Sequence, residues 1–216
     1  MYFNCHTHHY RKTPDCLELV NEYPHDFKGE SDYFSVGIHP WFIDFERLNA
    51  DFQALEKLLQ KENCLAVGEC GLDKKIETDF EKQVEIFERQ LLLAEKYQKP
   101  VILHCVAAYQ EMVAIKSKLN ITVPMILHGF SKKKQLAEEM FSHGFYLSFG
   151  KHLMKNENLK ESFLSVPDNQ FFLETDMDED PIETIYEKAS LYKNIETKTL
   201  INNIQNTFNQ VFKTQK

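Results

Sequence analysis

The sequence lacks long hydrophobic runs and paired cysteine motifs, and each absence excludes a class of protein. No apolar run approaches the roughly 18 residues that a membrane span requires, and no charged region followed by an apolar core marks the N-terminal residues. The five cysteines form no Cys-x-x-Cys pair, and their odd number fits free thiols in a reducing compartment. We therefore expect a soluble, cytoplasmic protein with no membrane partner and no obligate protein partner.

The sequence also has fewer basic than acidic residues. It has 33 acidic against 25 basic residues, which gives a formal net charge of −8. This balance argues against indiscriminate binding to a nucleic-acid backbone, because such affinity comes from clustered Lys and Arg. The 216 residues, 43% of them hydrophobic, suffice for one sizeable core, and no stretch is typical of a linker. We predict a single domain over residues 1–216.

Eight short segments have strand character, because they are rich in β-branched and aromatic residues and are bounded by turn-forming ones. They are residues 2–6, 16–22, 33–37, 64–68, 100–104, 123–127, 144–148 and 170–174. From the third onward, each is followed by a stretch with helical periodicity. The clearest apolar stripe comprises Phe80, Val84, Phe87, Leu91 and Ala94, and a second comprises Leu200, Ile204, Phe208, Val211 and Phe212.

The alternation of strands and helices predicts an α/β fold, specifically a compact (β/α)₈ TIM barrel. The gaps between the first three strands are too short for full helices. We therefore expect shortened helices there, with loops such as 9–15 and 24–32 in their place. An open doubly wound sheet is the alternative, although no Gly-x-Gly-x-x-Gly motif follows any predicted strand.

Potential metal ligands stand at the ends of the predicted strands. His6 and His8 are two residues apart, so in a strand their imidazoles project to the same face. The fourth, fifth, sixth and eighth strands run into ligands of the same kinds, namely Glu69, His104, His128 and Asp176. Because the carboxyl ends of barrel strands open onto one face, we expect these side chains to line one pit.

The number of these ligands indicates more than one ion. Four imidazoles and two carboxylates exceed one four-coordinate site and suit two divalent ions about 3.5–4 Å apart. Burying several ionisable groups together is costly unless a cation compensates them. The ligand set suits zinc, manganese, magnesium, iron or nickel. Two such cations leave an excess of positive charge that an anionic oxygen of a phosphodiester substrate would neutralise.

Six short motifs follow one another along the chain, and each occurs once. They are His6-Thr7-His8, Val36-Gly37-Ile38-His39-Pro40, Ala66-Val67-Gly68-Glu69-Cys70-Gly71-Leu72-Asp73, Pro100-Val101-Ile102-Leu103-His104, Leu127-His128-Gly129-Phe130-Ser131 and Leu173-Glu174-Thr175-Asp176. In these motifs, and in the helical stretch between Phe80 and Ala94, the sequence resembles the TatD family of metal-dependent deoxyribonucleases, within the wider group of amidohydrolase-like barrels. The Gly-Glu-x-Gly-Leu-Asp block is the most specific single piece.

The resemblance implies a metal-dependent hydrolase of phosphodiesters, with DNA or a smaller phosphodiester as the substrate. It assigns one ion to His6, His8, Glu69 and Asp176 and the other to Glu69, His104 and His128, so that Glu69 bridges them. A water or hydroxide between the ions would be the nucleophile, and Asp176 would orient it and accept its proton. Asp176 and Glu69 are therefore the expected catalytic residues.

The sequence departs from the family pattern at several positions. Asn4-Cys5 replace the usual Asp before the first His, and His9-Tyr10 replace Leu-Asp after the second. Cys105-Val106-Ala107 stand where the family commonly has Ser-Arg-Asp, and residues 177–180 are short and acidic. The planar fork of Arg matches phosphate oxygens, so its loss, together with the acidic residues 177–180, argues against a processive nuclease. A metal-dependent amidohydrolase acting on a small C–N substrate and a non-catalytic metal-binding scaffold are the alternatives.

Further residues near the predicted mouth of the barrel are candidates for substrate contact. They are His39 at the third strand end, Asp73 four residues beyond Glu69, and Lys151 and His152 after the seventh strand. A turn role beside Pro40 is the alternative for His39, and helix capping is the alternative for Asp73.

Overall fold

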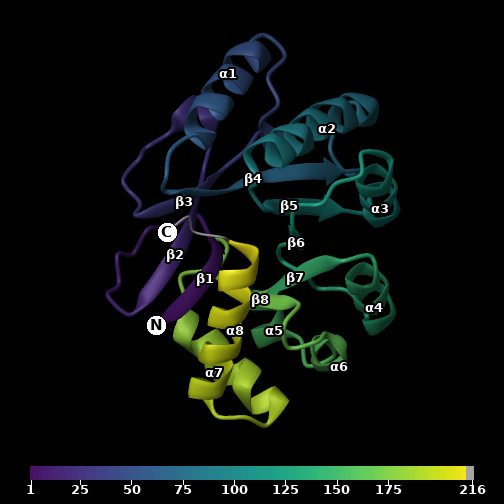
Figure 1. The fold of residues 1–216 in the computed structure, drawn as a ribbon. Coiled ribbons are helices and arrows are strands. Elements are labelled where there is room, and N and C mark those ends of the chain that lie inside the picture. The colour runs from purple at the N-terminus through teal and green to yellow at the C-terminus, as the bar shows by residue number, and fades with distance from the viewer. Residues whose placement is uncertain (213–216) are drawn as a thin grey trace. The chain divides into compact units, whose positions relative to one another are not determined.

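The structure, a computed structural model, describes residues 1–212 and contains one eight-stranded sheet (Figure 1). The strands follow one another in sequence order from β1 to β8, and they pair in parallel. A parallel bridge between Thr7 and Asp176 joins β8 to β1. A parallel sheet that keeps sequence order and closes on its first strand is that of a (β/α)₈ barrel. The predicted fold is confirmed, and the open doubly wound sheet is excluded.

The strands begin and end close to the predicted positions. They are β1 (Tyr2–Thr7), β2 (Cys16–Glu22), β3 (Tyr33–Val36), β4 (Cys64–Asp73), β5 (Val101–Val106), β6 (Met125–Leu127), β7 (Phe145–Phe149) and β8 (Phe171–Leu173). The prediction that the fourth and fifth strands finish on Glu69 and His104 is wrong, because these residues lie inside β4 and β5. The reason is that β4 and β5 continue to pair as far as Asp73 and Val106.

The helices follow the third and later strands, as predicted. They are α1 (Leu48–Leu59), α2 (Phe80–Tyr97), α3 (Tyr109–Lys118), α4 (Lys134–Ser142), α5 (Lys151–Lys155), α6 (Leu159–Ser165), α7 (Ile182–Lys193) and α8 (Thr197–Val211). The connections between the first three strands hold only the 3₁₀ turn η1 (Pro24–Asp26), and a second turn, η2 (Pro40–Phe42), follows β3. Within residues 1–212, no helix has both the length and the apolar character needed to cross a membrane.

The chain divides into two compact units. Unit 1 comprises residues 1–20 together with the chain from residue 126 onward, and unit 2 comprises residues 21–125. Each unit contains strands, the helices that cover them and part of the candidate ligand set. The single domain over residues 1–216 stays a prediction.

In unit 2, helix α2 packs along β4 with a face that is more polar than predicted. Phe87, Leu91 and Ala94 are buried, whereas Phe80 and Val84 are partly exposed. The helix begins after Asp79, whose side chain accepts the backbone N–H of Lys82 at 3.0 Å.

Two buried glutamines on α2 hold the backbone of neighbouring segments. The Gln90 amide accepts the N–H of Ile38 at 2.7 Å and donates to its carbonyl at 3.1 Å. The Gln83 amide bonds the backbone of Asp73 in the same way, at 2.9 and 3.0 Å. Because each amide satisfies both a donor and an acceptor, α2 fixes the positions of the residues that lead into His39 and that end β4.

In unit 1, helices α7 and α8 pack against β1 and β8. The predicted face of α8 is buried at Leu200, Ile204, Val211 and Phe212, while Phe208 is partly exposed. The ring of Phe3 in β1 lies 4.7 Å from that of Phe208 and 5.3 Å from that of Phe212. The hydroxyl of Tyr186 on α7 donates to the carbonyl of Phe3 at 2.9 Å and accepts its N–H at 3.2 Å. These contacts fix the strand that carries His6.

Candidate metal centre

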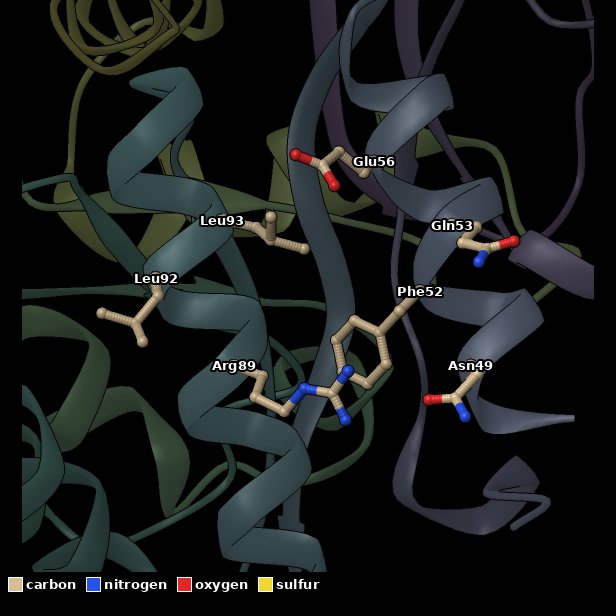
Figure 2. Close-up of a pocket in the computed structure, with 7 residues that line it drawn as sticks. All are labelled: Asn49, Phe52, Gln53, Glu56, Arg89, Leu92 and Leu93. Atoms are coloured by element: carbon tan, nitrogen blue, oxygen red, sulfur yellow. The ribbon is translucent and has the colours of Figure 1, made fainter. Parts of the chain in front are cut away.

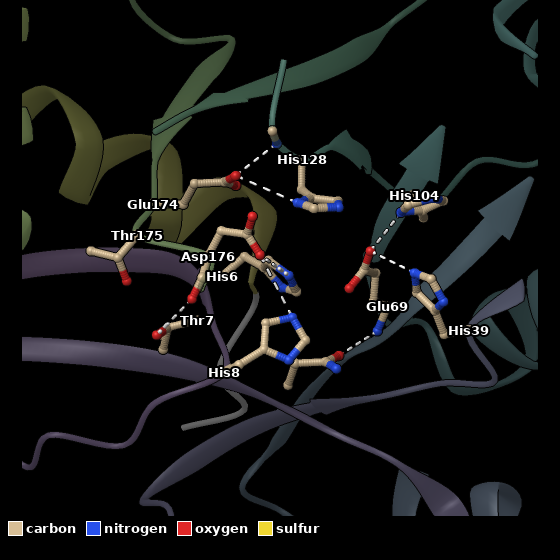
Figure 3. A network of polar contacts seen from close by, with 12 residues as sticks. His6, Thr7, His8, His39, Glu69, His104, His128, Glu174, Thr175 and Asp176 are labelled. Atoms are coloured by element: carbon tan, nitrogen blue, oxygen red, sulfur yellow. Dashed lines mark hydrogen bonds and ion pairs between the residues drawn. The ribbon is translucent and has the colours of Figure 1, made fainter. Parts of the chain in front are cut away.

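In unit 1, His6, His8 and Asp176 form a compact cluster (Figure 3). Each residue offers a ligand atom, and these atoms lie within 4.8 Å of one another. The Nε2 atoms of His6 and His8 are 3.9 and 3.7 Å from Oδ1 of Asp176. His6 is fully buried. The structure thus brings together three of the predicted metal ligands, two at the end of β1 and one just after β8.

Backbone pairing between β1 and the end of β8 positions this cluster. Asp176 donates its N–H to the carbonyl of His6 at 3.0 Å, and its carbonyl accepts the N–H of His8 at 3.1 Å. One residue earlier, the Asn4 amide donates to the Thr175 hydroxyl at 2.8 Å and accepts its N–H at 3.0 Å. Asn4 is one of the departures from the family pattern, and its role is to hold the segment that presents Asp176.

The carboxyl group of Asp176 is surrounded by cationic or ionisable neighbours. Burial raises its pKa, but the nearby His6, His128 and Lys151 outweigh that effect, so the pKa lies below its usual value. Lys151 on α5 places Nζ 3.1 Å from Oδ2 of Asp176. The pKa of His152, the next residue, is lowered by burial and by Lys151. Lys151 therefore sits beside the cluster, and substrate contact by either residue stays a prediction.

His128 follows β6, and its ring lies 4.4 Å from the ring of His6. Glu174, which is fully buried, places Oε1 3.5 Å from Nδ1 of His128. The same oxygen accepts the N–H of Gly129 at 2.7 Å. Sequence reasoning missed Glu174 as a site residue. Its position two residues before Asp176, at the end of a buried strand, was the available signal.

In unit 2, His39, Glu69 and His104 form a second cluster with ligand atoms within 4.8 Å of one another. Oε1 of Glu69 lies 3.1 Å from Nε2 of His39 and 2.9 Å from Nδ1 of His104, as the dashed lines in Figure 3 mark. All three residues are buried. The backbone N–H of Glu69 donates to the side chain of Asn21 at 2.6 Å. His39 is therefore as close to Glu69 as the predicted ligand His104.

The position of the ring proton on His39 follows from the hydrogen bonds of that imidazole. Nδ1 of His39 accepts the N–H of Trp41 at 3.1 Å, so in the neutral ring Nε2 carries the proton and donates it to Glu69. The Nε2 atom of His104 lies 3.4 Å from Oδ2 of Asp73. Substrate contact by His39 stays a prediction, and its observed partner is the Glu69 carboxylate.

Asp73 is buried at the end of β4 and supports His104. Its Oδ2 accepts the indole N–H of Trp41 at 2.8 Å, and its Oδ1 accepts the N–H of Lys75 at 2.8 Å. Burial raises the pKa of Asp73, but these hydrogen bonds and His104 lower it overall. Asp79, and not Asp73, caps α2. Substrate contact by Asp73 stays a prediction.

Each cluster supplies two imidazoles and one carboxylate, a donor set that divalent transition metals accept. In each cluster the ligand atoms lie within 4.8 Å of one another, which is close enough for one metal ion to bind them all. The residues present therefore fit a metal in each unit. A hollow of about 500 Å³ between α1 and α2 contains none of them (Figure 2). In that hollow the guanidinium of Arg89 lies 3.7 Å above the ring of Phe52.

Curated relatives share most of this chain. An uncharacterized metal-dependent hydrolase of Bacillus subtilis, YabD, is 32% identical over 167 residues, which cover 74% of this chain and 62% of the relative. The 3'-5' ssDNA/RNA exonuclease TatD of Edwardsiella piscicida is 31% identical over 172 residues, covering 76% of this chain and 63% of the relative. The matched part therefore spans less than two thirds of these relatives.

A solved structure shares the fold. The TatD homologue YjjV of Escherichia coli superposes with a TM-score of 0.79 at 20% identity, covering 92% of this chain and 86% of that chain. The model of the TatD-related DNase family matches residues 2–213. Because this match extends over nearly all of the sequence, the chain belongs to the TatD-related DNase family.

Proposed function

We propose that the protein is a metal-dependent phosphodiesterase that hydrolyses short single-stranded nucleic acids. The observation that carries the proposal is the pair of clusters, one fully and one partly buried, each with two imidazoles and a carboxylate. Relatives that are named metal-dependent hydrolases and 3'-5' ssDNA/RNA exonucleases support the reaction class.

The proposed ligand assignment follows the family resemblance. In that assignment, His6, His8 and Asp176 would hold one divalent ion, His104 and His128 would hold a second, and Glu69 would contribute to both. When bound, such ions lower the pKa of a water and polarise a phosphoryl oxygen. The backbone beside these ligands is already held by hydrogen bonds, from the Glu69 N–H to Asn21 and between Asp176 and both His6 and His8, which limits the reorganisation that binding requires.

Hydrolysis adds water across the P–O ester bond. We assign the Asp176 carboxylate as the acceptor of the proton that the attacking water loses, because its low pKa keeps it ionised at neutral pH. The ester oxygen that leaves takes up a proton. Lys151, 3.1 Å from Asp176, holds the carboxylate in place and adds positive charge where the phosphate would bind.

Short substrates fit the charges of this chain better than long ones. The net charge is −8, Val106 stands where the family commonly has Arg, and Asp178, Glu179 and Asp180 follow Asp176 closely. These features oppose a long polyanion, because its affinity depends on clustered cations. A few nucleotides present fewer phosphates and are repelled less.

Metal content and turnover of Glu69→Ala test this proposal. We expect about two ions per wild-type chain, fewer in the variant, and no hydrolysis of an aryl phosphodiester by the variant. Glu56→Gln is the matched control, because Glu56 is a surface acid of unit 2 that pairs with Lys96. Unchanged turnover in Glu69→Ala would overturn the role of Glu69. Faster hydrolysis of an aryl amide than of an aryl phosphodiester would favour an amidohydrolase.

A further inference from the structure

Unit 2 exposes a group of large apolar side chains directly after His39. Trp41, Phe42 and Phe45 have exposed fractions of 58%, 43% and 57%, and we call these three residues the aromatic edge. They lie within and just beyond the turn η2. Single exposed apolar residues are common, but three within five positions beside buried metal-type ligands indicate a binding surface.

Trp41 is held at both ends although more than half of it is exposed. Its indole N–H donates to Oδ2 of Asp73 at 2.8 Å, and its backbone N–H donates to Nδ1 of His39 at 3.1 Å. Asp73 is fixed in turn by the N–H of Lys75 and by Gln83. A ring that is already fixed loses little conformational entropy when a ligand binds to it.

The indole ring stands next to the ligand cluster of unit 2. Its centroid lies 5.1 Å from that of His39 and 5.5 Å from that of His104, with interplanar angles of 83° and 73°. A flat ring at nearly right angles to both imidazoles forms a wall beside them. A planar group stacked on the exposed part of the indole would therefore lie near His39 and His104.

We propose that Trp41 is a stacking surface for a nucleobase of the substrate, next to the phosphodiester that is cleaved. This inference rests on the proposed function and deepens it. Stacking is independent of base identity, and it supplies affinity that the scarce cations of this chain do not. Phe42, whose ring lies 5.5 Å from that of His39, is a second exposed ring beside the cluster. Removing one such ring is expected to weaken binding about tenfold.

The chain has a single tryptophan, so its fluorescence reports on Trp41 alone. We would titrate the manganese-loaded wild type with a hexathymidylate whose phosphorothioate linkages resist hydrolysis, and with an abasic hexamer that carries the same linkages. The expected result is quenching by the thymidylate at least tenfold tighter than by the abasic hexamer. Equal quenching by the two hexamers, or none by either, would overturn the proposal.

Kinetics of variants separate stacking from the reaction itself. Trp41→Ala should raise KM for the unmodified thymidylate about tenfold and change KM for the abasic substrate much less, and Trp41→Phe, which keeps an aromatic ring, should restore most of the loss. Leu92→Ala is the control, since Leu92 is a 52% exposed apolar residue of α2 in the same unit. Unchanged KM in Trp41→Ala would overturn the proposal. If the substitution changed only the oligomeric state, the proposal would also be overturned, and the aromatic edge would be identified as a protein interface. Failure of the proposed function is distinct, because then no variant and no wild type hydrolyses either substrate.

Discussion

Removing the hydroxyl of Tyr186 is a direct test of what holds the strand that carries His6. The hydroxyl makes two hydrogen bonds to the backbone of Phe3, and Tyr186 is fully buried. Tyr186→Phe deletes both bonds and leaves a buried N–H and a buried carbonyl without this partner. A buried hydrogen bond contributes about 1 kcal/mol net, so the expected loss of unfolding free energy is about 2 kcal/mol. For a chain of this size that corresponds to a Tm lower by about 4–8 °C.

Urea unfolding followed by circular dichroism measures this loss. Tyr192→Phe is the matched control on the same helix, because its hydroxyl donates at 2.8 Å to Glu157, whose side chain is 73% exposed. The Glu157 carboxylate remains hydrated after the substitution, so we expect a loss of unfolding free energy below about 0.5 kcal/mol. If Tyr186→Phe costs no more than Tyr192→Phe, the two hydrogen bonds do not stabilise β1 and the reasoning is refuted.

The remaining predictions concern metal affinity and thiol reactivity. Glu174→Gln keeps an oxygen for Gly129 but removes the charge facing His128, so it should weaken divalent-metal binding about tenfold by calorimetry. Equal affinity in Glu174→Gln and in a control at the exposed Glu161 would contradict that role. Burial raises the pKa of the Cys64 thiol to about 12 and also raises the pKa of Cys5 and Cys70. These thiols stay protonated at pH 8, so a thiol reagent should modify them only after unfolding, and rapid modification of the folded chain would contradict their burial.

The fold was predictable because most strands are short apolar segments with turn-forming residues at their ends. The length of β4 was not, because Gly68, Gly71 and Asp73 resemble a loop in sequence. In the structure those residues continue to pair with β5. Apolar periodicity also does not predict that Gln83 and Gln90 are buried. Their side chains are buried because they form hydrogen bonds with backbone groups, and not because they are hydrophobic.

The candidate ligands were predictable as residue types that recur after apolar segments. Their supporting partners were not, because each depends on a contact between distant positions. The links from Trp41 to Asp73 and from Asp73 to His104 join the turn η2 to β4 and β4 to β5, which no local pattern relates. Glu174 likewise acquires its role only because β8 lies where its side chain reaches Gly129 and His128. Local sequence fixes which side chains are candidates, and tertiary contacts fix their roles.

The two clusters differ in when the ribosome makes their parts. All three residues of the unit 2 cluster, His39, Glu69 and His104, precede residue 105, whereas the unit 1 cluster pairs His6 and His8 with Asp176. At about 5–20 residues per second, Asp176 is synthesised roughly 4–14 s after His104. During that interval the nascent chain carries every residue of the unit 2 cluster, while the unit 1 cluster still lacks Asp176. The two clusters are therefore completed in a fixed order, that of unit 2 first.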